Sequence, residues 1–444
     1  MSHYKPYPAY KDSGVEWLGL VPEHWDVCKL SFRYSIELGK MLDEKRLTKT
    51  SLVPYLRNQD VQWGSINTQD LPEMDIHPEE LERYTIRHGD LLVCEGGDVG
   101  RAAIWRGDNA AFGYQKALHR LRHRSVSADT AEFFYFSLLT AKQRGVFEES
   151  DSKATIAHLP AEKFRQYRFV FPPLPEQLCI AAQLDRETAR IDALIEKKTR
   201  FIELLREKRQ ALITHAVTKG LDPNVKMKDS GVEWLGEVPE HWIVSPLKQL
   251  VRFRSGGTPS KDNLEFWNGD IPWASAKDLK QEVLADTIDH LHQSAIESGA
   301  ASLVPSGSIL VVVRGMILAR LFPVVETLVP MAINQDLKAL VPFEKLNSRY
   351  LAHLLRGSSA ESLSRLEEAG HGTKALRMEN WVSIELPVPP LREQLAIIEM
   401  LDIQTARLDS LADKTERSID LLKERRSALI TAAVTGQIDL REAV

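Results

Sequence analysis

The side chains with the clearest potential for chemistry are cations that gather in two separate stretches. The first stretch, Lys-Ala-Leu-His-Arg-Leu-Arg-His-Arg at residues 116–124, places Arg120, Arg122 and Arg124 on one face if it forms a strand. Arginines aligned in this way suit phosphate oxygens or the edges of guanine bases. The alternative is a solvated strand face that balances the acidic stretch at residues 70–82.

The second stretch surrounds Ser-Gly-Gly-Thr-Pro-Ser at residues 255–260. Four cations lie nearby in the sequence, namely Arg252, Arg254, Lys261 and Lys277. The two adjacent glycines would let the backbone approach a phosphate or a base closely. A tight hairpin loop with incidental cations is the alternative interpretation.

Signatures of catalysis are absent from the sequence. It has no GxxxxGK[ST] phosphate loop, no HExxH, no GxSxG and no Asn/Asp-Pro-Pro-aromatic tetrapeptide of the amino-methyltransferases. The Gly-rich segment at residues 95–101 has the wrong spacing for a dinucleotide site and indicates a turn that carries Arg101. Lys153, in Asp-Ser-Lys, fits half of a nuclease site but lacks the preceding partner motif. Lys153 and Lys374 each lie in a loop of small residues. Each is either a phosphate contact or a lysine that only faces solvent. No catalytic residue is predicted.

Composition narrows the class of protein only slightly. The 444 residues include 57 basic and 62 acidic side chains, for a net charge of −5. The chain therefore lacks the excess of basic residues that would indicate nucleic-acid binding. Because phosphate affinity depends on where cations lie, this balance does not exclude DNA binding either. Cys28, Cys94 and Cys179 lack metal-ligand spacing, so no metal site is predicted. Without a membrane-length apolar run or a signal-peptide core, a cytoplasmic location is expected.

The chain repeats itself at a fixed offset. Lys-Asp-Ser-Gly-Val-Glu-Trp-Leu-Gly occurs at residues 11–19 and again at 228–236, an offset of 217, the difference between 228 and 11. Val-Pro-Glu-His-Trp at residues 21–25 returns at 238–242 with the same offset. The segments between the repeated blocks share almost no sequence. This pattern indicates a constant frame that carries two different inserts.

Two long helices are predicted within the frame, over residues 176–218 and 392–435. Both segments lack glycine and proline, and both carry an apolar stripe at heptad-like spacing. The predicted interface residues are Ile180, Leu184, Ile191, Leu194, Ile202, Leu205 and Leu212, and, 217 positions later, Ile397, Leu401, Leu408, Leu411, Ile419, Leu422 and Leu429. A helix of this length leaves its stripe in water unless a partner covers it. We therefore expect an antiparallel two-helix coiled coil with an insert at each end and an internal pseudo-twofold axis.

The inserts themselves are predicted to be compact α+β domains. Strands are expected at residues 90–94 and 118–121, and a helix over 129–147. The expected division is a tethered segment (1–25), a first domain (26–173), a long helix (174–220), a linker (221–242), a second domain (243–388), and a second long helix with a tail (389–444). Trp17 and Trp25 in the tethered segment, repeated as Trp234 and Trp242, are expected to pin it onto a neighbouring surface.

These motifs, in this order, closely resemble the specificity subunit of type I restriction-modification systems. The resemblance lies in the doubled Gly-Val-Glu-Trp-Leu-Gly…Val-Pro-Glu-His-Trp openings and the doubled Pro-Pro-Leu-x-Glu-Gln at residues 172–177 and 389–394. Gly-Asp-Leu-Leu at residues 89–92, the 255–260 segment and Asn-Gln-Asp at residues 334–336 are also similar to recurrent segments of that family. One departure is the Val-Val-Val-Arg-Gly-Met-Ile-Leu-Ala-Arg segment at residues 311–320, where a Gly-rich turn is usual.

The resemblance implies a non-catalytic subunit that recognises a bipartite, asymmetric double-stranded DNA target through its two inserts. It also implies that the frame helices bind two modification subunits, and restriction/translocase subunits through them. This chain would then bind no cofactor, while its partners use S-adenosylmethionine, ATP and Mg. The predicted DNA-binding residues are Arg57, Arg101, Lys116, Arg120, Arg122, Arg124, Lys153, Arg254, Gly257, Thr258, Lys261, Lys277, Arg314 and Lys374.

Two other classes of function compete with this interpretation. A self-sufficient restriction nuclease or methyltransferase would need a further catalytic domain, for which neither the length nor the motifs leave room. A coiled-coil adaptor that binds only protein would protect no DNA even together with its partners.

Overall fold

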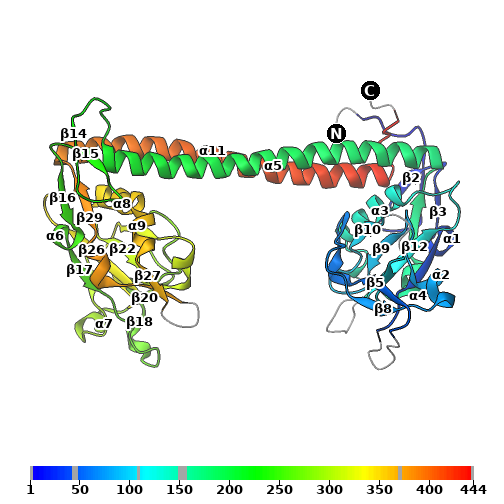
Figure 1. Ribbon diagram of the computed structural model, residues 1–444, viewed down its shortest axis with the longest axis horizontal. Helices are drawn as coiled ribbons and strands as arrows, with labels where there is room; N and C mark the ends of the chain where they lie inside the picture. Colours follow the sequence, from blue (N-terminus) through cyan, green and yellow to red (C-terminus); the bar gives the residue numbers. More distant parts are fainter. Residues whose placement is uncertain (1–3, 43–48, 108–110, 149–157, 369–372, 442–444) are drawn as a thin grey trace. The chain divides into compact units, whose positions relative to one another are not determined.

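The computed structural model describes residues 4–42, 49–107, 111–148, 158–368 and 373–441. The chain divides into two compact units, Met1–Lys198 with Arg417–Val444 and Thr199–Glu416, called the first and second unit below. Each unit combines a mixed helix-and-sheet body with parts of two long helices (Figure 1). No helix in the described part of the chain is both long and apolar enough to cross a membrane.

The two long helices are present where the sequence predicts them. α5 spans Leu174–Lys219 and α11 spans Leu391–Val434. Prolines stop the preceding strands, and each helix is followed by a glycine with positive φ, Gly220 at 78° and Gly436 at 74°. A glycine fits this position because the left-handed conformation that ends a helix strains any residue with a Cβ.

The apolar stripe of each helix is buried along most of its length, with one error of the prediction in each helix. Ile180, Leu184, Ile191, Ile202 and Leu205 are at most 7% exposed, and so are Ile397, Leu401 and Leu429. Ile419 is 8% exposed, and Leu212, Leu408 and Leu422 are half-buried. Leu194 and Leu411 are instead both 42% exposed, so the expectation that they lie in the interface is wrong. The alternating 3- and 4-residue spacing places the half-buried Ile195 and Ala412 there.

The first unit is built on an antiparallel sheet with strand order β10-β9-β12-β4. Its strands are Ala102–Ile104, Leu91–Cys94, Leu118–His123 and Tyr34–Leu38. β9 and β12 confirm the two predicted strands, and α3 (Ala131–Gln143) confirms the predicted helix with shorter ends. The buried face of α3 packs Phe134 and Leu138 against Leu91, Val93 and Leu121 in one core. A second sheet, β11-β5-β8, comprises Gly113–Tyr114, Leu52–Leu56 and Glu73–Asp75.

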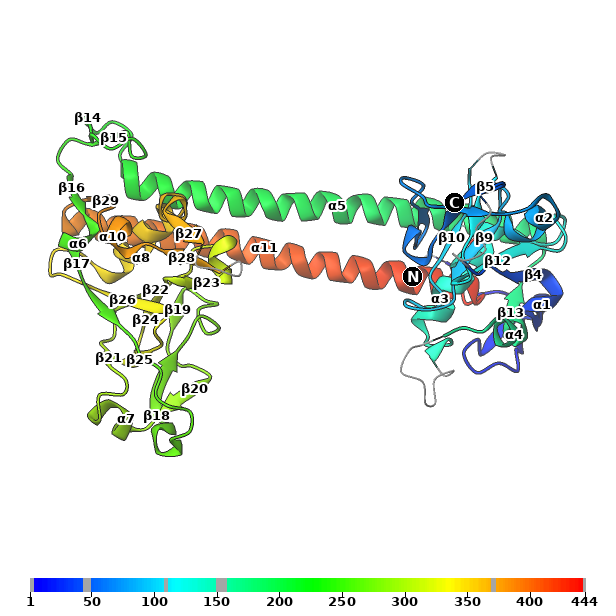
Figure 2. The same ribbon diagram turned by 60° about the horizontal axis from the view of Figure 1, so that its bottom comes forward.

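The second unit repeats this topology although its sequence differs. Its main sheet has the order β17-β26-β22-β24-β19, formed by Val251–Ser255, Leu337–Pro342, Ile309–Val312, Val324–Thr327 and Val283–Leu284. The first four strands match β4, β12, β9 and β10, and β19 is an added edge. The second sheet, β20-β18-β25-β21, comprises Asp289–Leu291, Trp267–Ala274, Met331–Ile333 and Leu303–Val304. Within this unit, Figures 1 and 2 show β18 and β20 farther from the long helices than β17 and β26.

Shorter elements complete both units. The first contains β6 (Val61–Gln62), β7 (Ser65–Ile66), α1 (Leu30–Arg33), α2 (Leu81–Tyr84), α4 (Ala161–Gln166), and the 3-10 turns η2 (Asn58–Asp60) and η3 (Pro78–Glu80). The second contains α6 (Leu247–Leu250), α7 (Gln293–Glu297), α8 (Ser348–Gly357), α9 (Ser359–Ser364), α10 (Met378–Trp381), β23 (Arg314–Gly315), β27 (Leu366–Glu368), β28 (Lys374–Leu376), η5 (Leu264–Phe266) and η6 (Met316–Ala319).

The repeated frame segments are more regular than the sequence suggests. Each contains a two-strand hairpin, β1 (Tyr10–Asp12) with β2 (Leu20–Pro22) and β14 (Met227–Asp229) with β15 (Glu237–Pro239). Next, β3 (Asp26–Lys29) pairs with β13 (Arg168–Phe171), and β16 (Ile243–Pro246) pairs with β29 (Glu385–Val388), which joins the two ends of each body. Trp25 and Trp242 are fully buried, as expected of residues that pin these segments.

Candidate nucleic-acid interface

Three of the predicted cations in the first unit lie in loops that Asn58 connects by hydrogen bonds. Arg101 donates from Nη2 to the carbonyl oxygen and to Oδ1 of Asn58, at 3.0 and 2.9 Å. The Nδ2 of Asn58 in turn donates to the carbonyl oxygen of Gly96 at 2.9 Å. We call the loops at residues 57–60, 95–101 and 115–117 the first corner. It holds Arg57, Arg101 and Lys116 at the ends of β5, β9 and β12.

The cations of the first corner differ in how firmly they are held. Arg57 forms a two-pronged hydrogen bond with the buried Asp60, with both nitrogen–oxygen distances at 2.8 Å. Burial opposes the charge on Asp60, yet the hydrogen bonds from Arg57 outweigh it and lower the pKa of this carboxyl. Lys116 is exposed. Arg57 and Arg101 therefore have fixed orientations, whereas Lys116 can reach toward a ligand.

The arginines of β12 do not form the exposed face that the sequence predicts. The segment is a strand, but it lies inside the sheet, and Arg120 is only 5% exposed. Its Nη1 donates to three carbonyl oxygens between residues 82 and 85, at 2.9 to 3.0 Å. The prediction that Arg120 is available to DNA is therefore wrong in this structure, because its donors close a neighbouring loop.

The other two arginines of this stretch separate as well. Arg122 is bound through two hydrogen bonds, of 2.6 and 2.5 Å, to the buried Asp90 of the Gly-Asp-Leu-Leu segment. Arg124 lies beyond the end of β12, is exposed, and donates from Nε to the carbonyl oxygen of Ser31 at 2.9 Å. Only Arg124 of the three remains at the surface. Lys153 lies outside the described residues.

In the second unit, the glycines of the 255–260 segment serve the fold first. A Cβ on Gly256 would lie 2.0 Å from the carbonyl oxygen of Ile333, so the close backbone approach is to this chain itself. The backbone nitrogen of Gly257 donates to the same carbonyl at 2.9 Å, and Trp273 Nε1 donates to the Gly257 carbonyl oxygen at 3.0 Å. The exposed Thr258 then donates to the side chain of Gln335 at 2.5 Å.

A second corner surrounds this segment, formed by the loops at residues 275–278, 313–315 and 334–336. Arg314 and Gly315 of β23 pair with Ala375 and Lys374 of β28, so the two predicted cations lie on adjacent strands, offset by one residue and on opposite faces of the ladder. Arg314 is exposed, whereas Lys374 is bound to Glu368 at 2.8 Å. The segment at residues 311–320, whose sequence departs from the family pattern, forms β23 and η6 where a Gly-rich turn is usual.

The remaining predicted residues of the second unit lie around this corner with different partners. Lys277 contacts Asp289 at 2.7 Å, and that hydrogen bond raises the pKa of the lysine. Arg254 is exposed on β17, an edge strand, and Lys261 is exposed after the 255–260 loop. Both corners lie at the same ends of matching strands, because β5, β9 and β12 correspond to β18, β22 and β26. The two units thus present different side chains at an equivalent place.

The repeated motifs explain how each body is attached to a helix. In the first unit, Glu176 at the start of α5 accepts from Trp25 Nε1 at 3.1 Å and lies 2.9 Å from His24 Nε2. In the second unit, Glu393 at the start of α11 accepts from Trp242 Nε1 at 2.9 Å and lies 2.6 Å from His241 Nε2. In each unit the repeated His-Trp and Glu-Gln pairs therefore bind each other. We call this group a clasp, formed by His24, Trp25, Glu176 and Gln177 in the first unit and by His241, Trp242, Glu393 and Gln394 in the second.

The glutamine of each clasp holds the body's main helix. Gln177 accepts from the backbone nitrogen of Thr130, the N-cap of α3, at 3.1 Å, and donates to the carbonyl oxygen of Pro172 at 2.8 Å. Gln394 makes the same contacts with Asn347, the N-cap of α8, at 2.8 Å, and with Pro389 at 2.9 Å. Thr130 and Asn347 also keep the offset of 217, so the repeat extends into segments where the sequences have diverged.

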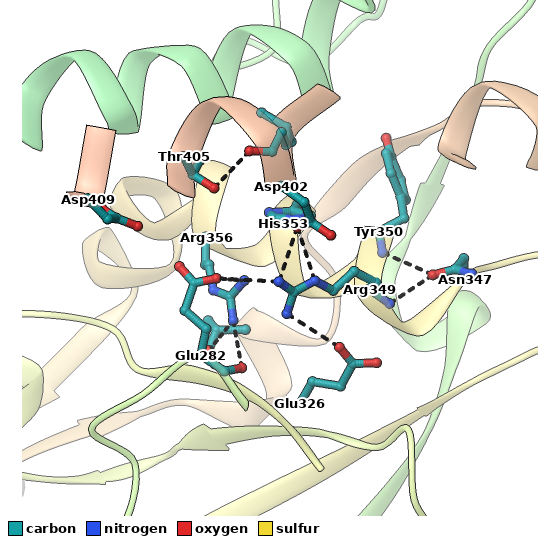
Figure 3. Close-up of polar contacts among 12 residues, drawn as sticks. Glu282, Glu326, Asn347, Arg349, Tyr350, His353, Arg356, Asp402, Thr405 and Asp409 are labelled. Atoms are coloured by element: carbon teal, nitrogen blue, oxygen red, sulfur yellow. Dashed lines mark hydrogen bonds and ion pairs between the residues drawn. The ribbon is translucent and has the colours of Figure 1, made fainter. Parts of the chain in front are cut away.

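The second unit adds a charged network between its body and its helix segments (Figure 3). Arg349 contacts Asp402 at 3.1 Å and Glu326 at 3.6 Å, and Arg356 contacts Glu282 at 3.0 Å. Burial opposes the charge of Glu282, but Arg356 and Arg209 outweigh it and lower the pKa of this carboxyl. Within the same network, burial lowers the pKa of Arg356 to about 10. This network fixes the body of the second unit against both helices.

The equivalent place in the first unit is open. Glu132, Phe136 and Leu139 occupy the positions of Arg349, His353 and Arg356. Asp185, the counterpart of Asp402, lines a cavity of about 190 Å³ together with Arg106 and Arg426. Burial raises the pKa of Asp185.

Sequence reasoning missed several residues that organise these sites. Asn58 and Arg349 carry no local motif, since each acquires its role from a segment distant in the sequence. Gln335 lies in the Asn-Gln-Asp segment, but its contact with Thr258 is not predictable from that motif. Glu176 and Gln177 were visible as repeated letters, and the constant offset between them and His24-Trp25 was the signal that could have paired them.

The chain matches a known protein family twice. Residues 22–204 and 239–419 match the family described as type I restriction modification DNA specificity domain. The type I restriction enzyme EcoR124I/EcoR124II specificity subunit of Escherichia coli is 30% identical over 205 residues, which cover 46% of this chain and 48% of that protein. The MjaVIII specificity subunit of Methanocaldococcus jannaschii is 23% identical over 452 residues, which cover 97% of each chain.

Solved structures of similar fold cover nearly the whole chain. A chain from a structure described as "Structural basis underlying complex assembly and conformational transition of the type I R-M system" has a TM-score of 0.74 and 16% identity, over 93% of this chain and 98% of that chain. The HsdS subunit of Thermoanaerobacter tengcongensis has a TM-score of 0.59 and 17% identity, over 94% and 98%. At these identities the likeness is one of fold.

Proposed function

The chain belongs to the type I restriction modification DNA specificity family, and we propose that it reads a two-part, asymmetric double-stranded DNA target, one part with each unit. The observation that carries this proposal is the pair of corners. They lie at the same ends of matching strands, yet the first presents Lys116 and Arg101, and the second presents Arg314, Thr258 and Gln335. Because base readout depends on side-chain donors and acceptors, unlike corners on one fold predict unlike half-sites.

The remaining surface cations are assigned supporting roles. Arg124, Arg254 and Lys261 are exposed at the sequence-predicted positions and suit phosphate contacts, which position a protein on DNA without reading bases. Lys277 and Lys374 would have to exchange a carboxylate partner for a phosphate. Arg57 and Arg122, tied to buried carboxylates, hold the loops of the first unit in place.

The finer architecture that we propose is an antiparallel coiled coil of α5 and α11 with a pseudo-twofold axis. Two ion pairs support it. Asp192 of α5 contacts Arg426 of α11 at 2.9 Å in the first unit, and Arg209 of α5 contacts Asp409 of α11 at 2.9 Å in the second. An offset of 217 turns each pair into the other, as a twofold relation between antiparallel helices requires. The predicted division into tethered segment, domains, helices and linker is part of this proposal.

Two modification subunits are the partners that we propose for the helices. Exposed leucines recur in pairs at the offset of 217: Leu178 and Leu395 are 54% and 56% exposed, Leu194 and Leu411 are both 42% exposed, and Leu204 and Leu421 are 46% and 64% exposed. Large apolar side chains repeated on exposed helix surfaces favour two equivalent protein contacts. Restriction/translocase subunits would join through the modification subunits, and S-adenosylmethionine, ATP and Mg would serve these partners, with catalysis lying outside this chain.

Footprinting of the chain together with its modification subunits tests the function. We expect two protected segments on each DNA strand, separated by a spacer whose sequence can be varied without loss of binding. Replacing residues 243–388 with those of a relative should change one half-site only. Absence of protection would favour the protein-only adaptor, and DNA methylation or cleavage by the purified chain alone would favour an enzyme.

A further inference from the structure

The two clasps are equivalent in their own contacts but differ in what covers them. In the first unit the Glu176 side chain is 5% exposed, whereas Glu393 in the second is 41% exposed. The histidines of the two clasps, His24 and His241, are 44% and 45% exposed. The difference therefore lies in what reaches the carboxylate.

In the first unit a tyrosine and an arginine cover the clasp. Tyr7 is 3% exposed and lies edge-on to Trp25, with ring centroids 5.4 Å apart, and 5.8 Å from the ring of His24. The guanidinium of Arg441 lies over the Tyr7 ring at 5.1 Å and 3.9 Å from Glu176. Burial and the Glu176 carboxylate raise the pKa of the Tyr7 phenol, which stays neutral beside that carboxylate.

In the second unit the same place is a cavity. The chain crosses directly from α5 to β14 and supplies neither a tyrosine nor an arginine there. A cavity of about 210 Å³ remains, lined by Pro239, His241, Glu393, Ala396 and Ile397 together with the crossing segment. Four of these lining residues stand 217 positions after Pro22, His24, Glu176 and Ile180 of the covered clasp. The cavity is therefore the counterpart of the site that Tyr7 and Arg441 cover.

The charge around the cavity favours a cationic occupant. Glu393 contributes a partly exposed carboxylate, and Asp222 contributes a second one from the crossing segment. Lys219 also lines the cavity, but its ammonium donates to the carbonyl oxygens of Leu235, at 3.0 Å, and Glu237. The wall is otherwise largely apolar, which suits an aromatic ring.

We propose that this cavity binds a tyrosine with an adjacent arginine from a partner protein, in the way that Tyr7 and Arg441 cover the first clasp. The ring would lie against Pro239 and Ile397, and the guanidinium would reach Glu393. A second copy of this chain is not the occupant that we propose, because its own Tyr7 and Arg441 are already held in its first unit. The proposal does not depend on DNA binding.

The test uses the full chain with ¹³C-labelled histidine and the dipeptide acetyl-Tyr-Arg-amide. The ring signals of His241 and His24 are assigned with His241→Asn and His24→Asn. We expect a saturable shift of the His241 signal and none of His24, because Tyr7 already covers the latter. Acetyl-Tyr-Gln-amide should bind about two- to fivefold more weakly, the range expected for the loss of one exposed ion pair. Acetyl-Ala-Arg-amide should not saturate.

Two variants separate the cavity from the rest of the surface. Ala396→Trp should fill the cavity and abolish the His241 shift, whereas Ala406→Trp, on an exposed part of the same helix, should leave it unchanged. Glu393→Gln should make the Tyr-Arg and Tyr-Gln peptides bind equally, which keeps the test valid if the tryptophan variant misfolds.

Several outcomes would overturn the proposal. One is equal shifts of His24 and His241, and another is no saturation at any peptide concentration. A His241 signal that moves with protein concentration, together with a doubled mass in sedimentation, would assign the cavity to a second copy instead. Because no DNA is present, these results stand apart from the footprint that tests the proposed function.

Discussion

Lys116 and Arg120 lie four residues apart in one cationic stretch, yet the structure gives them opposite roles. Lys116 is exposed at the first corner, whereas Arg120 is a buried residue of β12. We expect Lys116→Ala to weaken DNA binding by the assembled complex about three- to tenfold and to reduce the salt dependence by about one counterion, since it removes one cation from the corner that faces DNA. Affinity titrations at several salt concentrations measure both. Lys163→Ala, at an exposed lysine of α4, is the control, and an unchanged salt slope for Lys116→Ala would contradict the assignment.

Arg120→Ala should act on stability instead. It leaves three carbonyl oxygens between residues 82 and 85 without their donor, and we expect a loss of about 2 to 4 kcal/mol in the unfolding free energy of the first unit. Denaturant unfolding measures this loss. DNA affinity of the folded variant should change little, and a large affinity loss at unchanged stability would return Arg120 to the DNA surface.

We expect His353 to make the second unit less stable in acid. Burial lowers its pKa to about 4, and the neighbouring Arg356 and Arg349 add to this shift. The pKa of a histidine in an unfolded chain is about 6.5. Between this pH and about pH 4 the unfolded chain therefore binds a proton at His353 that the folded chain does not bind. Stability that is fully present above about pH 6.5 should therefore fall as the pH drops toward about 4, by about 2 kcal/mol at about pH 5.

His353→Phe removes this titration. Phenylalanine already stands at the equivalent position of the first unit, Phe136. The variant should lose stability at neutral pH, because Asp402 loses a hydrogen-bond partner, but its melting temperature should change less between pH 7 and 5 than that of the parent. His292→Gln, at an exposed histidine, is the control and should keep the parent's pH profile. Parallel profiles for the parent and His353→Phe would place the acid sensitivity elsewhere.

At the scale of elements, Leu194 and Ile195 separate helix packing from partner binding. Leu194 is 42% exposed, and its neighbour Ile195 occupies the half-buried heptad position. We expect Ile195→Ala to cost about 1 to 2 kcal/mol of stability and Leu194→Ala less than about 0.5 kcal/mol. Leu194→Ala should instead weaken association with the modification subunits, which calorimetry of complex formation measures. If Leu194→Ala cost more stability than Ile195→Ala, the result would support the sequence prediction that Leu194 lies in the interface between the helices.

The error at Leu194 shows what the sequence could and could not predict about the elements. The absence of glycine and proline was enough to predict α5 and α11 nearly to their ends. The interface was harder, because the buried positions include Thr188, Thr405 and Thr415, which no apolar pattern marks. The strand at β12 was predicted from its residues, but its place inside the sheet depends on β4 and β9, which are distant in the sequence.

At the scale of the whole molecule, we propose that the coiled coil sets the distance between the two half-sites. Inserting four residues after Thr199 in α5, with the matching insertion after Glu416 in α11, adds about 6 Å of helix. The tolerated DNA spacer should change by about two base pairs, given about 3.4 Å per base pair, while both half-sites stay the same. Footprints or methylation maps of the variant complex measure this. Replacing four residues there without changing the length is the control, and altered half-sites with an unchanged spacer would refute the ruler.

The internal repeat allowed the two-unit plan to be predicted, since the offset of 217 survives wherever the frame survives. The bodies were beyond this reasoning, because their sequences share almost nothing while their strand orders agree. Side chains at the corners were partly predictable as surface cations. Their partners, such as Asn58 for Arg101 and Asp60 for Arg57, follow only from the folded loops.

The first unit is formed by two segments that lie far apart in the sequence, and this affects the order in which the two units can fold during synthesis. The second unit is one continuous stretch, Thr199–Glu416, whereas the first also needs Arg417–Val444. Tyr7, Val21 and Trp25 share a core with Ile430, Val434 and Leu440, so part of the earliest-made apolar surface must wait for residues made hundreds of positions later. The second unit can thus mature before the first, although domains generally fold from the N-terminus during synthesis. A chain released before Arg417–Val444 is made would therefore carry a folded second unit and an incomplete first unit. The apolar surface around Tyr7, Val21 and Trp25 would then stay exposed to chaperones and proteases.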